Sequence, residues 1–310
     1  MSRFYEFIQK IRGEEAALDG FHPTTLPDDS AELRDLLALT ASEWKPAMTP
    51  GFQQTTLSLA DIPTETIEIL PESRLITHTD ARSVAADRYR FLRLRLNSIA
   101  KAGSLKTILV TSPIPRDGKT TVALNLASAL LDKRAQSVLV IDADLHHSAA
   151  SCLLGLQDRP GLTECLSKKV HPLSTVRRLE PLGWHFMPAG VPAVQPTQLL
   201  QDDGLPGLLK SLGSYFDWVI LDAPPVLPLT DATLLSQHAD GILLVARADM
   251  TPRAALEDTV STLGKRRIIG LVLNGVLEAT KRYGDYGHYY GKRSSRPEQP
   301  PSVSNDIEDR

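Results

Sequence analysis

The segment 112–144 combines a loop that can bind phosphate with an acidic strand end. A helix is expected to begin near its central residues, which read Gly118, Lys119, Thr120 and Thr121. The free backbone N–H groups of a helix start, together with the positive end of its dipole, favour an anion. Lys119 adds a mobile positive charge for the outer phosphates, and the Thr120 hydroxyl is a ligand for Mg²⁺. This loop therefore predicts a site for the phosphates of a nucleotide.

The loop does not match the general phosphate-binding pattern completely. Pro113 stands where that pattern has its first glycine, so the tetrapeptide alone leaves open a Gly-Lys turn at the start of an ordinary helix. Asp117 directly precedes Gly118, and we include it among the residues expected to contact the nucleotide. The decision between a nucleotide site and a plain helix cap depends on what lies beside the loop.

Carboxylates follow two further apolar strand patterns. Asp142 and Asp144 end the pattern that begins at Val138, and Asp222 ends the pattern that begins at Trp218. The first of these strands comes one crossover helix after the strand that precedes the loop, so we expect it to be that strand's parallel neighbour, with its carboxyl end beside the loop. Carboxylates beside a triphosphate imply Mg²⁺ and a base. The sequence therefore predicts a Mg-nucleotide site.

Strand and helix patterns alternate through most of the chain, which predicts an α/β fold with a doubly wound, mostly parallel sheet. Strands are expected at 107–111, 138–142, 184–187, 218–222, 241–247 and 268–274, and helices from 118, at 161–166, at 197–212 with breaks at Gly204 and Pro206, and at 252–263. Arg247 and Asn274 end two of these strands beside the crevice. They are candidates for contact with the base or ribose of the nucleotide, although strand ends carry such residues for structural reasons as well.

Charge is unevenly distributed along the 310 residues. The whole chain has a net charge of −3, whereas residues 1–80 contain 14 acidic and 6 basic side chains, a net of −8 that leaves +5 for the remainder. We predict that residues 1–74 form an acidic, partly disordered arm with short helical patterns at 4–17 and 31–39. The negative total argues against non-specific DNA binding, so no nucleic-acid partner is expected.

The chain has no apolar run near the roughly 20 residues that a membrane-spanning helix needs, and its first residues do not resemble a signal peptide. Its two cysteines, Cys152 and Cys165, lie among apolar neighbours and lack metal-ligand spacing. We therefore expect a cytoplasmic protein with two reduced, buried thiols.

A helix is predicted over residues 83–101, where apolar residues recur every three or four positions. On the other side of this predicted helix, Asp87, Arg90 and Arg93 form a charged ridge, because residues three apart are neighbours on a helix surface. A solvated helix face is the ordinary explanation for such a ridge. The excess of arginine favours a second interpretation, in which the ridge binds carboxylates of a partner.

Four of the chain's seven tyrosines lie within eight residues near its end, interleaved with glycine. They are Tyr283, Tyr286, Tyr289 and Tyr290. Glycine at this density disfavours regular structure, so we predict that residues 281–310 form a flexible tail. One interpretation of the cluster is a low-complexity segment whose aromatic side chains make non-specific contacts. The other is that a protein that binds ATP phosphorylates these hydroxyl groups.

These segments, in this order, resemble the bacterial tyrosine autokinases of capsular and exopolysaccharide systems. The loop at 112–121 looks like their Walker A motif, residues 140–145 like Walker A′, and residues 219–225 like Walker B. The charged helix ridge is similar to the family's Glu-x-x-Arg-x-x-Arg subunit-contact motif, and the tyrosine cluster to its carboxy-terminal tail. The resemblance implies a P-loop NTPase fold of MinD and ParA type over residues 75–280.

The resemblance also implies an activity, cofactors and partners. The expected reaction is a non-specific protein-tyrosine kinase reaction, with phosphoryl transfer from ATP and Mg²⁺ to the tyrosine cluster, largely between subunits of a ring. Lys119 would hold the phosphates, Thr120 and Asp222 the Mg²⁺, and Asp142 and Asp144 would share contacts to the metal and its water and acceptance of the tyrosine proton. The expected partner is the cytoplasmic tail of a membrane polysaccharide co-polymerase, which would recruit the chain to the inner face of the plasma membrane.

The sequence departs from the family pattern at several positions. Arg116 stands where the family usually has glycine, Asp117 and Asp87 replace glutamate, and His146 and His147 stand where arginine is usual. The two histidines are expected in a surface loop. Two other functions remain open, a ParA or MinD type ATPase switch and a nucleotide-binding scaffold. The switch proteins carry an extra lysine early in the loop, where this chain has Ile114.

Overall fold

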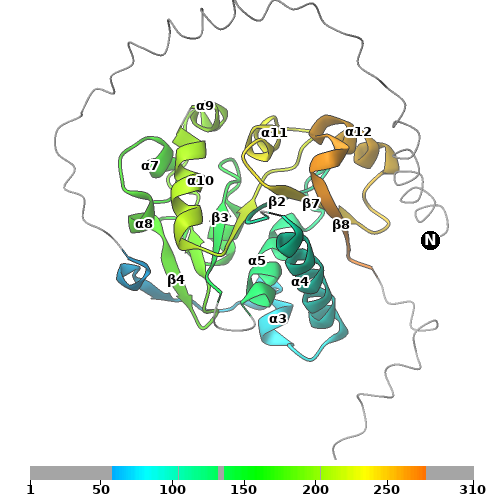
Figure 1. Ribbon diagram of the computed structural model, residues 1–310, viewed down its shortest axis with the longest axis horizontal. Coiled ribbons are helices and arrows are strands. Elements are labelled where there is room, and N and C mark those ends of the chain that lie inside the picture. Colours follow the sequence, from blue (N-terminus) through cyan, green and yellow to red (C-terminus); the bar gives the residue numbers. More distant parts are fainter. Residues whose placement is uncertain (1–57, 104, 132–135, 203, 277–310) are drawn as a thin grey trace, which may run out of the picture. The chain divides into compact units, whose positions relative to one another are not determined.

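The computed structural model describes residues 58–103, 105–131, 136–202 and 204–276. Within them, eight strands form one sheet (Figure 1). The strands are β1 (Thr64–Thr66), β2 (Thr107–Thr111), β3 (Val138–Asp142), β4 (Arg177–Glu180), β5 (His185–Met187), β6 (Trp218–Asp222), β7 (Gly241–Arg247) and β8 (Ile268–Asn274). The strand predictions are therefore confirmed to within a residue or so.

The strand order is β1-β4-β5-β3-β6-β2-β7-β8, and all neighbouring pairs are parallel except β4 and β5. The prediction of a doubly wound, mostly parallel sheet is confirmed. The prediction that β3 would pair with β2 is wrong, because β6 lies between them. The acidic end of β6 consequently occupies the centre of the sheet, with Asp142 of β3 as the register partner of Asp222.

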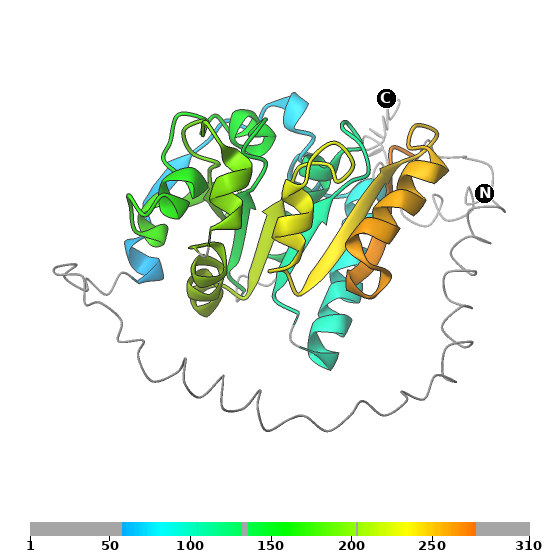
Figure 2. The same ribbon diagram turned by 90° about the horizontal axis from the view of Figure 1, so that it is seen from above.

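Helices cover both faces of the sheet, as Figures 1 and 2 show. The apolar cluster on one face includes side chains of α4 (Val84–Ala102), α5 (Lys119–Leu130) and α6 (Ala149–Leu153), beside which lies α3 (Ile76–Thr79). The cluster on the other face includes side chains of α7 (Leu162–Leu166), α8 (Pro172–Thr175), α9 (Pro196–Gln201), α10 (Gly204–Tyr215), α11 (Asp231–Ser236) and α12 (Arg253–Leu263). Short 3₁₀ helices span Leu59–Asp61, Pro71–Ser73 and Lys265–Arg267.

Alternate residues of each central strand enter opposite cores. In β2, Leu109 packs in the cluster of α7 to α12, whereas Ile108 and Val110 pack in the cluster of α4 to α6. Burial on both faces explains why these strands are continuous apolar runs in the sequence. It also leaves only their carboxyl ends for polar side chains, and this is where the acidic residues lie.

Three details differ from the sequence predictions. Residues 64–66 of the predicted arm form β1, which pairs with β4, so the sheet begins before residue 75. Pro206 does not interrupt a helix, because it lies in the first turn of α10, where its missing N–H has no helical partner in any case. Cys152 is exposed, because it follows the buried Ser151 on the short helix α6 and faces outward, while Cys165 is buried as expected.

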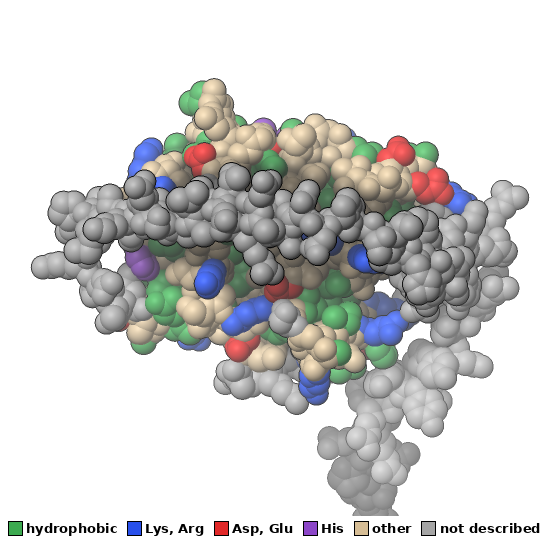
Figure 3. Space-filling model, turned by 45° about the horizontal axis from the view of Figure 1, so that its top comes forward, with side chains coloured by type: hydrophobic (Ala, Val, Ile, Leu, Met, Phe, Trp, Pro, Cys, Tyr) green, Lys and Arg blue, Asp and Glu red, His purple; other side chains and the backbone are tan. Residues whose placement is uncertain are grey.

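Some predictions lie outside the described residues. These are the helical patterns at 4–17 and 31–39 and the tyrosine tail at 281–310. No helix among the described residues has the length and apolar character that crossing a membrane requires. On the described part of the face that Figure 3 shows, acidic and basic side chains are interspersed.

Candidate functional site

The loop between β2 and α5 turns sharply into its helix at Gly118. This residue caps α5 with a φ of +94°, a conformation in which glycine is favoured. A Cβ atom at this position would lie 2.0 Å from Nδ2 of Asn274. Nδ2 of Asn274 donates a hydrogen bond of 3.0 Å to the carbonyl oxygen of Asp117. Asn274, at the end of β8, thus braces the loop from the side.

Asp117 holds the loop through its buried side chain. Its Oδ1 accepts a hydrogen bond of 2.7 Å from the hydroxyl of Thr251, and its Oδ2 accepts one of 3.4 Å from the backbone N–H of Ile114. The Thr251 hydroxyl also accepts the backbone N–H of Arg247 at 2.7 Å. Burial raises the pKa of Asp117, and these hydrogen bonds oppose that rise. Both oxygens of the Asp117 carboxylate therefore accept hydrogen bonds that hold the loop, so only the backbone of Asp117 would contact the nucleotide.

Arg116 adopts the left-handed conformation that the family's usual glycine would adopt freely. Its φ is +69°, which costs a non-glycine residue about 1 kcal/mol. Its carbonyl oxygen accepts a hydrogen bond of 3.3 Å from Nη1 of Arg247, at the end of β7. The departure from the family pattern therefore falls on a position where the backbone conformation matters.

Lys119 is the first residue of α5 and points to the acidic strand ends. Its Nζ lies 3.2 Å from Oδ2 of Asp144, and both side chains are largely buried. Thr120 is buried on the next position of α5, and Thr121 is half-buried after it. The helix start thus brings a cation and a hydroxyl to the carboxyl edge of the sheet.

Asp142 is buried but well supplied with hydrogen bonds. Its Oδ2 accepts the backbone N–H of Ser151 at 2.8 Å and the Ser151 hydroxyl at 2.7 Å, and its Oδ1 accepts the backbone N–H of Asp144 at 3.3 Å. The Ser151 hydroxyl in turn accepts the backbone N–H of Ala189 at 3.0 Å. Burial raises the pKa of Asp142 to about 6, and the hydrogen bonds from Ser151 limit the rise.

Asp222 is equally buried, but neither of its carboxylate oxygens has a hydrogen-bond partner among the described residues. Burial raises its pKa to about 7, the nearby Lys119 ammonium and the Thr120 hydroxyl oppose the rise, and the Asp142 and Asp144 carboxylates add to it. A buried carboxylate without partners is costly unless a cation or a proton neutralises it. A cation bound beside the loop would therefore stabilise the charged form of Asp222.

The donor atoms fit Mg²⁺. Carboxylate and hydroxyl oxygens are the ligands this ion prefers, and it usually binds through one or two carboxylates together with phosphate oxygens and water. No group of three or more His, Cys, Asp or Glu side chains in the described part of the chain is placed to hold a metal ion alone. Mg²⁺ bound to Asp222 and Thr120 would therefore need the phosphates of a nucleotide as further ligands.

The two histidines after Asp144 differ in environment. Nε2 of His146 lies 3.0 Å from Oδ2 of the buried Asp231, whose Oδ1 accepts a hydrogen bond of 2.6 Å from the hydroxyl of Thr197. His147 is 77% exposed at its side chain, as expected for a surface loop. His146 instead ties the loop after β3 to α11, which the sequence prediction did not anticipate.

Three supporting side chains were missed in the sequence. Ser151 holds Asp142, Thr251 holds Asp117, and Asp231 holds His146. Asp231 could have been found, because it follows a Pro-rich loop at the start of a helical pattern, where an acidic residue is typical. Ser151 and Thr251 carry no comparable signal, since their partners are nine and 134 positions away.

The charged ridge on α4 is bonded largely within the chain. Arg90 pairs with Asp87 and also donates to the carbonyl oxygen of Ala81. Nη1 of Arg93 donates a hydrogen bond of 3.2 Å to the carbonyl oxygen of Ala129, in the last turn of α5. The ridge thus has a role in holding α4 in place, and its contact with another subunit stays a prediction.

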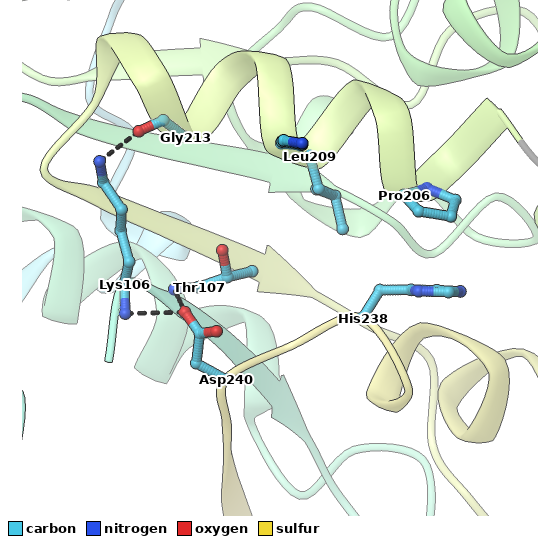
Figure 4. A pocket seen from close by; sticks show the side chains of 8 residues that line it. Lys106, Thr107, Pro206, Leu209, Gly213, His238 and Asp240 are labelled. Atoms are coloured by element: carbon cyan, nitrogen blue, oxygen red, sulfur yellow. Dashed lines mark hydrogen bonds between the residues drawn. The ribbon is translucent and has the colours of Figure 1, made fainter. Parts of the chain in front are cut away.

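A separate pocket of about 390 Å³ lies at the amino-terminal ends of β2 and β7, at the other end of these strands from the phosphate-binding loop (Figure 4). Lys106 there donates to the carbonyl oxygen of Gly213, and Oδ2 of Asp240 accepts the backbone N–H groups of Lys106 and Thr107. His238 also lines the pocket. Lys106 and Thr107 lie at the start of β2, His238 and Asp240 precede β7, and Gly213 lies in α10, whereas the loop follows the end of β2. The pocket is therefore not part of the site around Lys119.

The parallel sheet, the loop at the start of α5 and the acidic strand ends define a P-loop NTPase. An AAA domain family matches residues 116–266. Over 227 residues the chain is 28% identical to the tyrosine-protein kinase YwqD of Bacillus subtilis, covering 72% of this chain and 94% of that protein. It is 28% identical over 220 residues to the tyrosine-protein kinase Wzc of Salmonella typhimurium, of which it spans only 30%, with 70% of this chain covered.

Among solved structures, the BceF tyrosine kinase domain is 30% identical, with a TM-score of 0.58 over 67% of this chain and 85% of that domain. The chain therefore belongs to the bacterial tyrosine-protein kinase family.

Proposed function

We propose that this chain is an ATP-dependent tyrosine autokinase that phosphorylates its own carboxy-terminal tyrosine cluster. The observation that carries the proposal is the fully buried, unpartnered carboxylate of Asp222 beside Lys119 and Thr120 at the phosphate-binding loop. Such a carboxylate is suited to a metal-nucleotide complex. Membership of a family of tyrosine kinases supports tyrosine as the acceptor, and the four tyrosines at 283–290 are the candidate acceptors in this chain.

In the proposed reaction, a tyrosine hydroxyl oxygen bonds to the γ-phosphorus of ATP while the bond from that phosphorus to the bridging oxygen breaks and ADP leaves. Phosphoryl transfer of this kind depends mainly on positioning and charge neutralisation. Lys119 would exchange its contact with Asp144 for the phosphates, which frees the Asp144 carboxylate. Asp142 and Asp144 would share acceptance of the phenolic proton.

Mg²⁺, when bound with the nucleotide, would neutralise phosphate charge. Asp222 and Thr120 would hold it, with Asp142 reaching it directly or through water. Because Ser151 fixes Oδ2 of Asp142, only Oδ1 of that carboxylate is available for such a contact.

The proposal includes a ring-like homo-oligomer in which the tail of one subunit reaches the site of the next. Asp87, Arg90 and Arg93 of α4 would contribute to the subunit contact. Phe91 and Leu94, which are 63% and 57% exposed, supply apolar area on the same helix. The activating partner would be the cytoplasmic tail of a membrane polysaccharide co-polymerase, and the role would be control of exopolysaccharide synthesis and export.

The test is to incubate the purified chain with Mg-ATP and to map phosphate by mass spectrometry. Lys119→Met and a variant with all four tail tyrosines changed to phenylalanine serve as controls. We expect phosphate on the tail of the wild type and none in either variant.

The same experiment separates the two alternatives. ATP hydrolysis with bare tyrosines, even after addition of a candidate activator peptide, would favour an ATPase switch. Nucleotide binding without turnover would favour a scaffold.

A further inference from the structure

Arg116 is the residue of the phosphate-binding loop that the proposed function leaves unexplained. It lies two positions before Gly118, the cap of α5, and its side chain is exposed. Among the described residues, its side chain forms no hydrogen bond or ion pair, since its one contact of this kind is through its backbone oxygen. Its backbone is held in place, because its carbonyl oxygen accepts Nη1 of Arg247.

The backbone conformation makes an arginine here costly. A φ of +69° is a strained conformation for a residue with a Cβ atom, and glycine would adopt it without that strain. An exposed side chain without a partner does not repay this cost within the described structure. A strained residue in a ligand-binding loop is a reason to look for a role in binding.

The surrounding charges show what kind of role is open to it. Lys119 is already paired with Asp144, which follows the end of β3 by two residues, and Asp142 and Asp222 are the last residues of β3 and β6. The Arg116 side chain is exposed on the loop itself and pairs with none of these carboxylates. Its positive charge therefore remains available to an anion bound at the loop.

We propose that Arg116 is an additional phosphate-binding residue, whose guanidinium group contacts the phosphate chain of the bound nucleotide and slows its release. The inference rests on the proposed nucleotide site but not on tyrosine as the acceptor. The planar guanidinium donates paired hydrogen bonds to phosphate oxygens, which a glycine cannot do. The arginine thus compensates in binding for the backbone strain it introduces.

The experiment measures the dissociation constant of Mg-ADP with a fluorescent ADP analogue, so it does not depend on kinase activity. Arg116→Gln keeps a Cβ atom and its strain but removes the charge, whereas Arg116→Gly removes both. Arg266→Gln removes an exposed arginine at the opposite edge of the sheet and is the matched control. We expect the dissociation constant to rise about 5-fold in both Arg116 variants and to stay unchanged in the control.

Two further readouts separate charge from strain. The 5-fold difference should shrink as salt is raised, because salt screens an exposed charge. The nucleotide-free Arg116→Gly variant should melt no lower than the wild type, because glycine accepts the left-handed conformation. A loss of binding in Arg116→Gly alone would indicate a backbone effect and overturn the proposal.

Wild-type affinity in Arg116→Gln would overturn the proposal, and tighter binding in Arg116→Gly would show that the arginine hinders the nucleotide. A chain that binds Mg-ADP through Arg116 but leaves its tyrosines bare would contradict the kinase function and keep this inference. A wild type that does not bind Mg-ADP would contradict both.

Discussion

Asp142 and Asp222 occupy equivalent places in the sheet but differ in their partners. They are register partners at the ends of neighbouring parallel strands, and both are completely buried. Asp142 accepts two hydrogen bonds from Ser151, whereas Asp222 accepts none from the described residues. The pKa of Asp142 is raised to about 6 and that of Asp222 to about 7.

Two aspartates at equivalent places in the sheet therefore differ in how their charged forms are stabilised. Hydrogen bonds from Ser151 stabilise the charged form of Asp142 and fix its orientation. Asp222 accepts no such hydrogen bond among the described residues, so its charged form depends on Lys119, on the nearby Thr120 hydroxyl and on a cation supplied from outside. The chain tolerates this unfavourable carboxylate because the proposed Mg-nucleotide complex would satisfy it, which is a trade of stability for binding.

The largest effect is expected for Asp222→Asn. The variant should lose tyrosine phosphorylation by about 1,000-fold or more, because it removes the proposed metal ligand. Without nucleotide it should be more stable than the wild type by about 1–3 kcal/mol, because a buried carboxylate without partners is replaced by a neutral amide. Phosphate incorporation and thermal melting measure the two effects.

Asp258→Asn, which changes an exposed carboxylate on α12, is the control for the loss of one negative charge. It should leave both quantities unchanged. If Asp222→Asn melts below the wild type, then Asp222 has a structural partner and the contrast with Asp142 is lost.

The second prediction concerns a variant in which Asp142, like Asp222, lacks a hydrogen bond from a serine hydroxyl. Ser151→Ala removes the hydroxyl that donates to Asp142 and accepts the N–H of Ala189. We expect a loss of about 1–3 kcal/mol in the free energy of unfolding, since buried polar groups lose their partners. Denaturant unfolding measures it. Ser214→Ala, whose hydroxyl donates to an exposed helix carbonyl, should change stability by less than about 0.5 kcal/mol.

The third prediction concerns pH and nucleotide-free protein. The ordinary pKa of an aspartate is 3.8, and that of Asp222 in the folded chain is about 7. Between these values the folded state holds a proton that the unfolded state has released, so this carboxylate lowers stability as pH rises. The melting advantage of Asp222→Asn over the wild type should therefore grow from about pH 5 to about pH 7.5. An advantage that shrinks over this range would contradict the raised pKa.

The ends of β3 and β6 can be located from the sequence, but the side chains that distinguish Asp142 from Asp222 cannot. Asp142 and Asp222 were predicted at one edge because each ends a run of buried apolar residues, and a parallel sheet brings such ends together. The insertion of β6 between β2 and β3 was not predicted, since strand order depends on long-range packing that leaves no local pattern. The same holds for Ser151 and Thr251, whose hydroxyl groups look ordinary in the sequence.

The smallest effect on stability is expected at the helix ridge, where charges are exposed rather than buried. Arg90→Ala removes an ion pair with Asp87 whose side chains are about half exposed, together with an exposed hydrogen bond to the carbonyl oxygen of Ala81. Exposed interactions of this kind contribute about 0.5 kcal/mol each. The melting temperature should change little, and nucleotide binding should not change at all.

If α4 contacts a second subunit as proposed, the same variant should still weaken self-association measured by sedimentation, because an arginine at an interface contributes more than one in solvent. Arg178→Ala, which breaks a comparably exposed pair with Glu180 on β4, is the matched control and should assemble as the wild type does. Equal assembly of both variants and the wild type would confine the ridge to holding α4 on its own chain.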